Sequence, residues 1–376
     1  QDSNDIGDFY YTPPTDFLAL CTSNLPDVAV VPSEHYNTVT FTGDGASSSH
    51  PATQSVSVGF QPDFVWLKNR SEARASALFD SVRGVTKGLR SDTTAAEATS
   101  TAGYDFTSFE TNGFTVGEPE NWNSTNEDGT SIVAWNWKAN GTGSANTDGN
   151  MAETVTVSAN ADAGFSIVTY TGDGAVATVG HGLSKAPELI LVKQRSDAQA
   201  WIVYHSGIAS DAETDILVLN ATSAASDSAT YWNDTAPTAD VFTLGTHAQV
   251  NGDDSTYVAY CFHSVDGFSK MGSYTGNGST DGTFVYTSFA PAYILWKNIT
   301  DAGTNWVVFD NKRDTFNPND DALYPNTTDD EEEDYDVDFV SNGFKFRNTS
   351  SWANSNGKKY IYMAFAETPF KYSNAR

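Results

Sequence analysis

The sequence predicts an all-β protein of three tandem β-sandwich or jelly-roll-like modules that follow a short N-terminal lead-in segment. Two observations carry this prediction: the composition, and a set of strand-like blocks that recurs three times in the same order. Of the 376 residues, 39% are hydrophobic and 13% are aromatic, which is too many apolar side chains for a disordered chain. Glycine is abundant, with 29 residues, as expected where many turns join short strands.

The internal repeat is the most specific feature of the sequence. Its first block is Thr-Gly-Asp-Gly at residues 42–45, which returns at 171–174 and, as Thr-Gly-Asn-Gly, at 275–278. Four further blocks follow in each copy: 61–70, 186–195 and 290–298; 77–80, 201–205 and 306–310; 111–117, 239–245 and 341–347; 132–137, 257–262 and 360–365. This ordered recurrence indicates that one structural unit folds three times.

Nearly every block has the pattern of a β-strand. Residues 64–67, 189–192 and 293–296 are short apolar runs, rich in β-branched and aromatic side chains, which favour a strand buried on both faces. The Asn-Gly pairs at 112–113 and 342–343 are typical of hairpin turns, because both residues tolerate a positive φ. We therefore expect about five to eight strands per module.

The blocks also suggest a division of the chain. The stretch between the first two copies is rich in Gly, Ser, Asn, Thr and Ala, as linkers are, whereas the second and third copies abut. We predict a lead-in segment at 1–37, module 1 at 38–140, a linker at 141–163, module 2 at 164–266, and module 3 with a C-terminal tail at 267–376. Because the chain begins with Gln1, we expect a processed terminus or a fragment of a longer polypeptide.

The loops between the third and fourth blocks differ most among the copies. They cover residues 86–104, 211–236 and 315–337. Divergent polar loops on a rigid β scaffold are where binding functions are usually found. The alternative is that these loops are solvated and carry no function.

Charge and cysteine content exclude several classes of partner. The net charge is −28, which disfavours binding to nucleic acid or to an anionic membrane surface. No apolar run approaches the ~18 residues that a membrane span needs. Cys21 and Cys261 are expected to be free and buried; a disulfide between them is the alternative.

No arrangement of residues predicts catalysis or a cofactor. None of the six histidines has a partner at metal-ligand spacing, and His205 stands where the other copies have Asp80 and Asp310. Asp44 of the first block becomes Asn277 in the third copy, a change that a turn accepts but a general acid does not. We therefore expect a protein that is not an enzyme.

Two groups of residues are candidate sites. Asp329, Asp330, Glu331 and Asp334 belong to an acidic run that could bind Ca²⁺ through several carboxylate oxygens; a solvated acidic loop is the alternative. Three aromatic residues outside the strand-like blocks could stack on glycans, with a packing role as the alternative: Trp122, Trp232 and Trp352.

These motifs resemble a known repeat. Residues 42–45, 61–70 and 79–84 are similar to a repeat family of unknown function in virion proteins of marine and aquatic phages. Residues 10–26 resemble the stretch that follows a SPRY domain in those proteins. The resemblance implies a phage particle component, such as a tail fibre, an appendage or a capsid decoration, and it brings no catalytic residues.

The expected function is that of a non-catalytic, extracellular virion protein with a structural or adhesive role. Its expected partners are further copies of the same chain, other virion proteins and host-surface glycans. One alternative is the subunit of a bacterial or environmental extracellular filament. Another is a glycan-cleaving tail spike.

Overall fold

The structure is a computed structural model that describes residues 30–45 and 53–367. In this part of the chain the helices are single turns: η2 (Pro32–Glu34), η3 (Ala212–Thr214), α1 (Ala229–Trp232) and α2 (Ala248–Asn251). All other regular structure is β, and every strand pair is antiparallel. The prediction of an all-β fold is confirmed.

The same four-stranded sheet occurs three times, in the regions that we call repeats 1, 2 and 3 after the predicted modules. In repeat 1 its order is β1-β9-β3-β4. These strands are β1 (Tyr36–Thr42), β3 (Phe64–Asn69), β4 (Ala77–Asp80) and β9 (Ser131–Trp137). A smaller sheet, β2-β8-β7, and a short β5-β6 pair complete the repeat: β2 (Gln54–Ser57), β5 (Lys87–Gly88), β6 (Ala98–Thr99), β7 (Phe106–Glu110) and β8 (Gly113–Val116).

Repeat 2 contains the equivalent order β12-β19-β14-β15 inside a sheet of eight strands. These strands are β12 (Phe165–Thr171), β14 (Leu189–Gln194), β15 (Ile202–His205) and β19 (Thr256–Phe262). The sheet is extended by β10 (Ser144–Asn146), β11 (Val155–Asn160), β16 (Asp215–Val218) and β17 (Ser226–Asp227). The smaller sheet pairs β13 (Ala177–Gly180) with β18 (Val241–Leu244).

In repeat 3 the order is β20-β27-β22-β23. These strands are β20 (Ser269–Thr275), β22 (Pro291–Asn298), β23 (Trp306–Asp310) and β27 (Lys359–Ala366). The smaller sheet has the order β21-β26-β25-β24. Its strands are β21 (Phe284–Tyr286), β24 (Asn319–Ala322), β25 (Glu332–Val340) and β26 (Gly343–Phe346).

Each large sheet is apolar on both faces. In repeat 1, Val65 and Leu67 of β3 pack with Phe114 of the small sheet in one cluster, which makes a sandwich. Phe64 and Trp66, which alternate with them on the same strand, belong to a second cluster that contains residues of all three repeats. This arrangement explains why the central strand of each repeat is a continuous apolar run.

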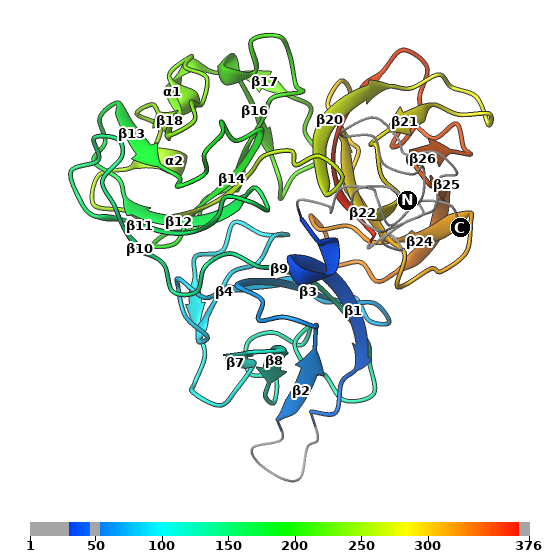
Figure 1. Ribbon diagram of the computed structural model, residues 1–376, viewed down its shortest axis with the longest axis horizontal. Coiled ribbons are helices and arrows are strands. Elements are labelled where there is room, and N and C mark those ends of the chain that lie inside the picture. Colours follow the sequence, from blue (N-terminus) through cyan, green and yellow to red (C-terminus); the bar gives the residue numbers. More distant parts are fainter. Residues whose placement is uncertain (1–29, 46–52, 368–376) are drawn as a thin grey trace, which may run out of the picture.

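The large sheets face the centre of the molecule and the small sheets lie outside, so that three lobes surround one shared core (Figure 1). At this centre Trp137, Phe262 and Phe365, the equivalent residues of the three copies, form a triangle. Their ring centroids lie 6.2, 5.7 and 6.2 Å apart, and each residue is 1% exposed. The core is therefore continuous across the repeats, and the predicted module boundaries stay a prediction.

The stretch from 141 to 163, expected to be a linker, is not irregular. It contains β10 and β11, and β11 pairs with β12 from Thr156↔Thr169 to Asn160↔Phe165. The composition suggested a flexible connection, but the open edge of β12 offers backbone donors and acceptors that an adjacent segment can satisfy.

The Gly-Asp-Gly blocks are turns, each held by a buried asparagine. Asn126 accepts a hydrogen bond from the Asp44 backbone N–H at 3.0 Å, and Asn251 and Asn354 do the same for the equivalent turns of repeats 2 and 3. A Cβ on Gly43 would lie 2.2 Å from the Glu127 carbonyl oxygen, so the close approach requires glycine. These blocks thus have a structural role.

Candidate functional site

The three repeats meet at three equivalent boundaries. At the boundary of repeats 1 and 2, the Glu97 N–H donates to the Arg195 carbonyl oxygen at 2.9 Å. Two equivalent hydrogen bonds occur at the other boundaries: Ala225 N–H to Ile299 O at 3.1 Å between repeats 2 and 3, and Glu331 N–H to Arg70 O at 2.9 Å between repeats 3 and 1. The contacts therefore close a ring.

A charged network fills the boundary of repeats 1 and 2. The Arg83 Nε lies 2.5 Å from Asp80 Oδ2, and both side chains are fully buried. Glu97 accepts from Arg83 at 3.1 Å and from Arg195 at 2.8 Å, while the Tyr260 hydroxyl donates to Asp80 at 2.7 Å. Burial alone would lower the pKa of Arg83, but Asp80, Tyr260 and Glu97 raise it, so the guanidinium stays charged.

The boundary of repeats 3 and 1 has the same network at equivalent positions. Arg313 Nε lies 2.6 Å from Asp310 Oδ2, again with both side chains fully buried. Glu331 accepts from Arg313 at 2.7 Å and from Arg70 at 2.9 Å, and the Trp135 indole donates to Asp310 at 2.9 Å. Trp135 takes the place that Tyr260 has in the first network.

The boundary of repeats 2 and 3 is apolar at these five positions, except for a neutral histidine. His205 stands where the charged boundaries have aspartate. Ile208 and Ile299 stand in place of the two arginines, Ala225 in place of the glutamate and Met363 in place of Tyr260. These four residues belong to or pack against the central cluster. The His205 Nε2 lies 3.1 Å from the Tyr362 carbonyl oxygen, and Nδ1 accepts from the Gly207 N–H. Burial lowers the pKa of His205 to about 4.

Each repeat has a buried lysine near the end of its central strand, and these lysines also distinguish the two charged boundaries from the apolar one. Lys68 donates to the Thr327 carbonyl of repeat 3 at 2.8 Å, and Lys193 donates to the Thr94 carbonyl of repeat 1 at 3.2 Å. Lys297 instead donates within its own repeat, to Thr304. Burial lowers the pKa of each lysine to about 8.

The aromatic residues suggested for glycan contact are mostly not available for stacking. Trp122 and Trp232 are each 2% exposed. Trp122 packs edge-on against Phe79, and the Trp232 indole donates to a backbone carbonyl. Trp352 is half-buried and stacks on Tyr335 with centroids 5.6 Å apart. The burial of Trp122 and Trp232 favours the packing alternative, because a buried ring offers no face to a sugar.

The acidic run does not converge on one point. Asp329, Asp330 and Asp334 are exposed, whereas Glu331 is held by two arginines in the boundary network. Within residues 30–45 and 53–367 no group of three or more His, Cys, Asp or Glu side chains could hold a metal ion. Calcium binding at this run therefore has no geometric support.

Of the two cysteines, Cys261 lies in the part of the chain that the structure describes. Cys261 is buried and free, and burial raises the pKa of its thiol. Cys21 lies outside the described residues. None of the helices in the described part of the chain is long and apolar enough to cross a membrane.

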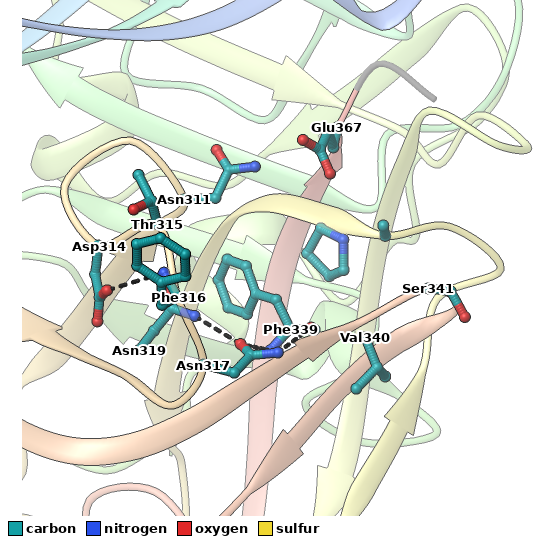
Figure 2. Close-up of a pocket in the computed structure, with 12 residues that line it drawn as sticks. Asn311, Asp314, Thr315, Phe316, Asn317, Asn319, Phe339, Val340, Ser341 and Glu367 are labelled. Atoms are coloured by element: carbon teal, nitrogen blue, oxygen red, sulfur yellow. Dashed lines mark hydrogen bonds between the residues drawn. The ribbon is translucent and has the colours of Figure 1, made fainter. Parts of the chain in front are cut away.

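A hollow of about 460 Å³ lies in repeat 3 and is a candidate for ligand binding. In Figure 2 the residues of the loop after β23 are grouped with Phe339, and Glu367 lies apart from them beyond β27. The residues that line the hollow are Ala290, Pro291, Asn311, Asp314, Thr315, Phe316, Asn317, Asn319, Phe339, Val340, Ser341 and Glu367.

Side-chain to backbone hydrogen bonds hold the loop that lines this hollow. Asn317 Nδ2 donates to the Phe339 carbonyl at 2.7 Å, and its Oδ1 accepts from the Phe339 N–H at 2.8 Å (Figure 2). Asp314 accepts from the backbone N–H groups of Phe316 and Asp320. The loop thus presents Phe316, which is 81% exposed, from a fixed backbone.

Sequence reasoning missed both the networks and this hollow. The spacing Asp-x-x-Arg at Asp80 and Asp310, absent at His205, was a signal for the networks. For the hollow the signal was only the divergence of the loop that contains Phe316, since its conformation depends on bonds to Phe339.

The fold and the boundaries define an all-β protein whose repeated sandwiches close into a ring. Residues 31–369 match the family described as a domain of unknown function (DUF7483), and the chain belongs to that family. The match spans all three repeats. The search of curated proteins found no match.

Proposed function

We propose that this chain is a non-catalytic structural or adhesion protein of a phage particle, such as a tail fibre, an appendage or a capsid decoration. In this proposal it acts outside the cell and associates with further copies of itself and with other virion proteins. The supporting observation is the ring of boundaries, in which buried charged and polar groups join the repeats to one another. A stiff body of this kind suits a protein that builds or decorates a particle.

The strand-end position of each repeat also supports a structural role. Asp80 and Asp310 each accept hydrogen bonds from an arginine and from an aromatic side chain, and His205 is bonded through both ring nitrogens. All three residues are at most 1% exposed. A general acid or base must reach its substrate, and these groups are committed to the fold.

The test is to locate the chain on particles. Particles purified by density gradient from a lysate of the host that carries this gene are analysed by mass spectrometry and by labelling with an antibody against residues 53–367. We expect the chain at a fixed ratio to the major capsid protein. Its absence from pure particles, or its presence on cellular filaments, would overturn the proposal.

A further inference from the structure

We propose that the hollow of repeat 3 is a binding site for a neutral saccharide. This goes beyond the proposed function, because a site with a defined ligand class does not depend on where the chain resides. Four observations support this site: an exposed aromatic side chain on a fixed loop, buried acceptors without a donor, the charge of the lining residues, and the presence of Phe316 in one repeat only.

The exposed ring is Phe316. A phenylalanine that is 81% exposed leaves nearly its whole apolar face in water, at a cost that a ligand can relieve. The C–H face of a pyranose ring is flat and apolar, and it covers such a ring well. Because Asn317 and Asp314 already fix the loop, binding loses little backbone freedom.

Two amide oxygens at the hollow have no hydrogen-bond donor among the described residues. Asn319 is 2% exposed, and its Oδ1 is buried without a partner. The Oδ1 of Asn311, from the start of the same loop, is in the same condition. A buried acceptor without a donor is unfavourable by about 1–3 kcal/mol, and a ligand hydroxyl can supply the donor.

The charge of the lining selects among ligands. The described residues that line the hollow include Asp314 and Glu367 but no Lys, Arg or His. A phosphate, sulfate or uronate group would be repelled there, as would the backbone of a nucleic acid. Carboxylates and amide oxygens accept hydrogen bonds, and a neutral saccharide offers several hydroxyl donors on one ring.

The aromatic side chain at position 316 has no counterpart in the other two copies. Counting from the equivalent residues Asp80, His205 and Asp310, Phe316 corresponds to Thr86 and Asp211. A side chain needed for packing would be expected in every copy, since the sheets that support it are the same. Phe316 packs little and is unique to repeat 3, which favours a role in binding.

The experiment titrates the full chain with defined oligosaccharides. The probes are neutral tetrasaccharides of glucose, mannose and galactose, a tetragalacturonate as anionic control and a tetralysine peptide, followed by saturation-transfer NMR and calorimetry. We expect at least one neutral tetrasaccharide to bind, and Phe316→Ala to weaken it about tenfold, or about 1.4 kcal/mol. Asn311→Ala should weaken binding too, because its side-chain oxygen has no partner in the free protein.

The matched control is Phe284→Ala, which removes another exposed phenylalanine of repeat 3, 46% exposed, away from the hollow. It should leave affinity unchanged, and thermal unfolding verifies that all variants fold. The inference is overturned if no neutral probe binds, if Phe316→Ala and Phe284→Ala behave alike, or if the anionic probe or the peptide binds the hollow instead. Because the isolated chain is measured, none of these outcomes bears on its presence in particles.

Discussion

The two charged boundaries and the apolar boundary join neighbouring repeats in the same geometry but with different side chains. All three are closed by the same backbone hydrogen bond, at Glu97, Ala225 and Glu331. Two of them contain a buried aspartate–arginine pair, whereas the third has His205 and Ile208 at the same positions. Between the charged and the apolar boundaries all five equivalent side chains differ together. This indicates that the stability contributed by each of them depends on the others.

This coupling has a physical cause. A buried ion pair gains about as much from attraction as it loses in desolvation, so an apolar set of similar size can replace it. Removing one member alone is different, because it leaves a charge buried without its counter-charge. The two kinds of boundary should therefore respond very differently to single and to combined substitutions.

The largest effect is expected when one charged network is broken. Arg83→Met leaves Asp80 buried without its ion-pair partner and should lower the free energy of unfolding by about 3–5 kcal/mol in urea titrations. Arg313→Met should cost as much at the second network. Arg74→Met, which breaks the partly exposed pair with Glu127, is the control at about 1 kcal/mol or less. Equal effects of Arg83→Met and the control would contradict the distinction.

At the apolar boundary, acid should act through His205. The folded pKa is about 4, below the ~6.5 of an unfolded chain, so above pH 6.5 both states are neutral. As the pH falls from 6.5 to 4 the unfolded state takes up the proton first, and this residue alone should lower the free energy of unfolding by about 3 kcal/mol.

His205→Gln removes this titration. The difference in unfolding free energy between the parent and the variant, measured from pH 7 to pH 4, cancels the common contribution of the carboxylates. We expect it to shift by about 3 kcal/mol in favour of the variant on acidification. Parallel curves would show that His205 is not buried in neutral form.

A smaller effect is expected from the Tyr260 hydroxyl, which crosses the first boundary. Tyr260→Phe deletes the donor to Asp80 and should cost about 1–3 kcal/mol by urea unfolding. At the equivalent position of the apolar boundary, Met363→Leu changes shape only and should cost about 1.5 kcal/mol or less. If Tyr260→Phe is silent, the hydroxyl is not part of the network.

The smallest effect is expected from the largest change. Replacing all five residues of the first network by those of the apolar boundary should leave the free energy of unfolding within about 1 kcal/mol of the parent or raise it. The five changes are Asp80→His, Arg83→Ile, Glu97→Ala, Arg195→Ile and Tyr260→Met. A variant as unstable as Arg83→Met would sink the idea that the two sets are interchangeable.

The strands could be predicted from the sequence because they depend on local patterns. Residues 64–67 and 293–296 are continuous apolar runs, and both prove to be buried on both faces. The segment of β10 and β11 was not predicted, because its pairing depends on a free sheet edge rather than on its own composition.

The site was harder to predict for a similar reason. Arg195 and Arg70 could be aligned with Ile299. Their respective partners, Glu97 and Glu331, lie in loops of unequal length, so the pairing was not visible. The loop of Phe316 was expected to be divergent and polar. Only the bonds between Asn317 and Phe339 show which side chain it exposes.

The triangle of Trp137, Phe262 and Phe365 has a consequence for how such a body can vary. Three separate identical chains around an axis would repeat every substitution threefold, so a change tolerated at one place would have to be tolerated at all. Here one polypeptide places a tryptophan at one corner and a phenylalanine at each of the other two. The same freedom lets a single lobe carry Phe316, so the saccharide site that we propose would give each molecule a valency of one while the other two lobes keep their own loops.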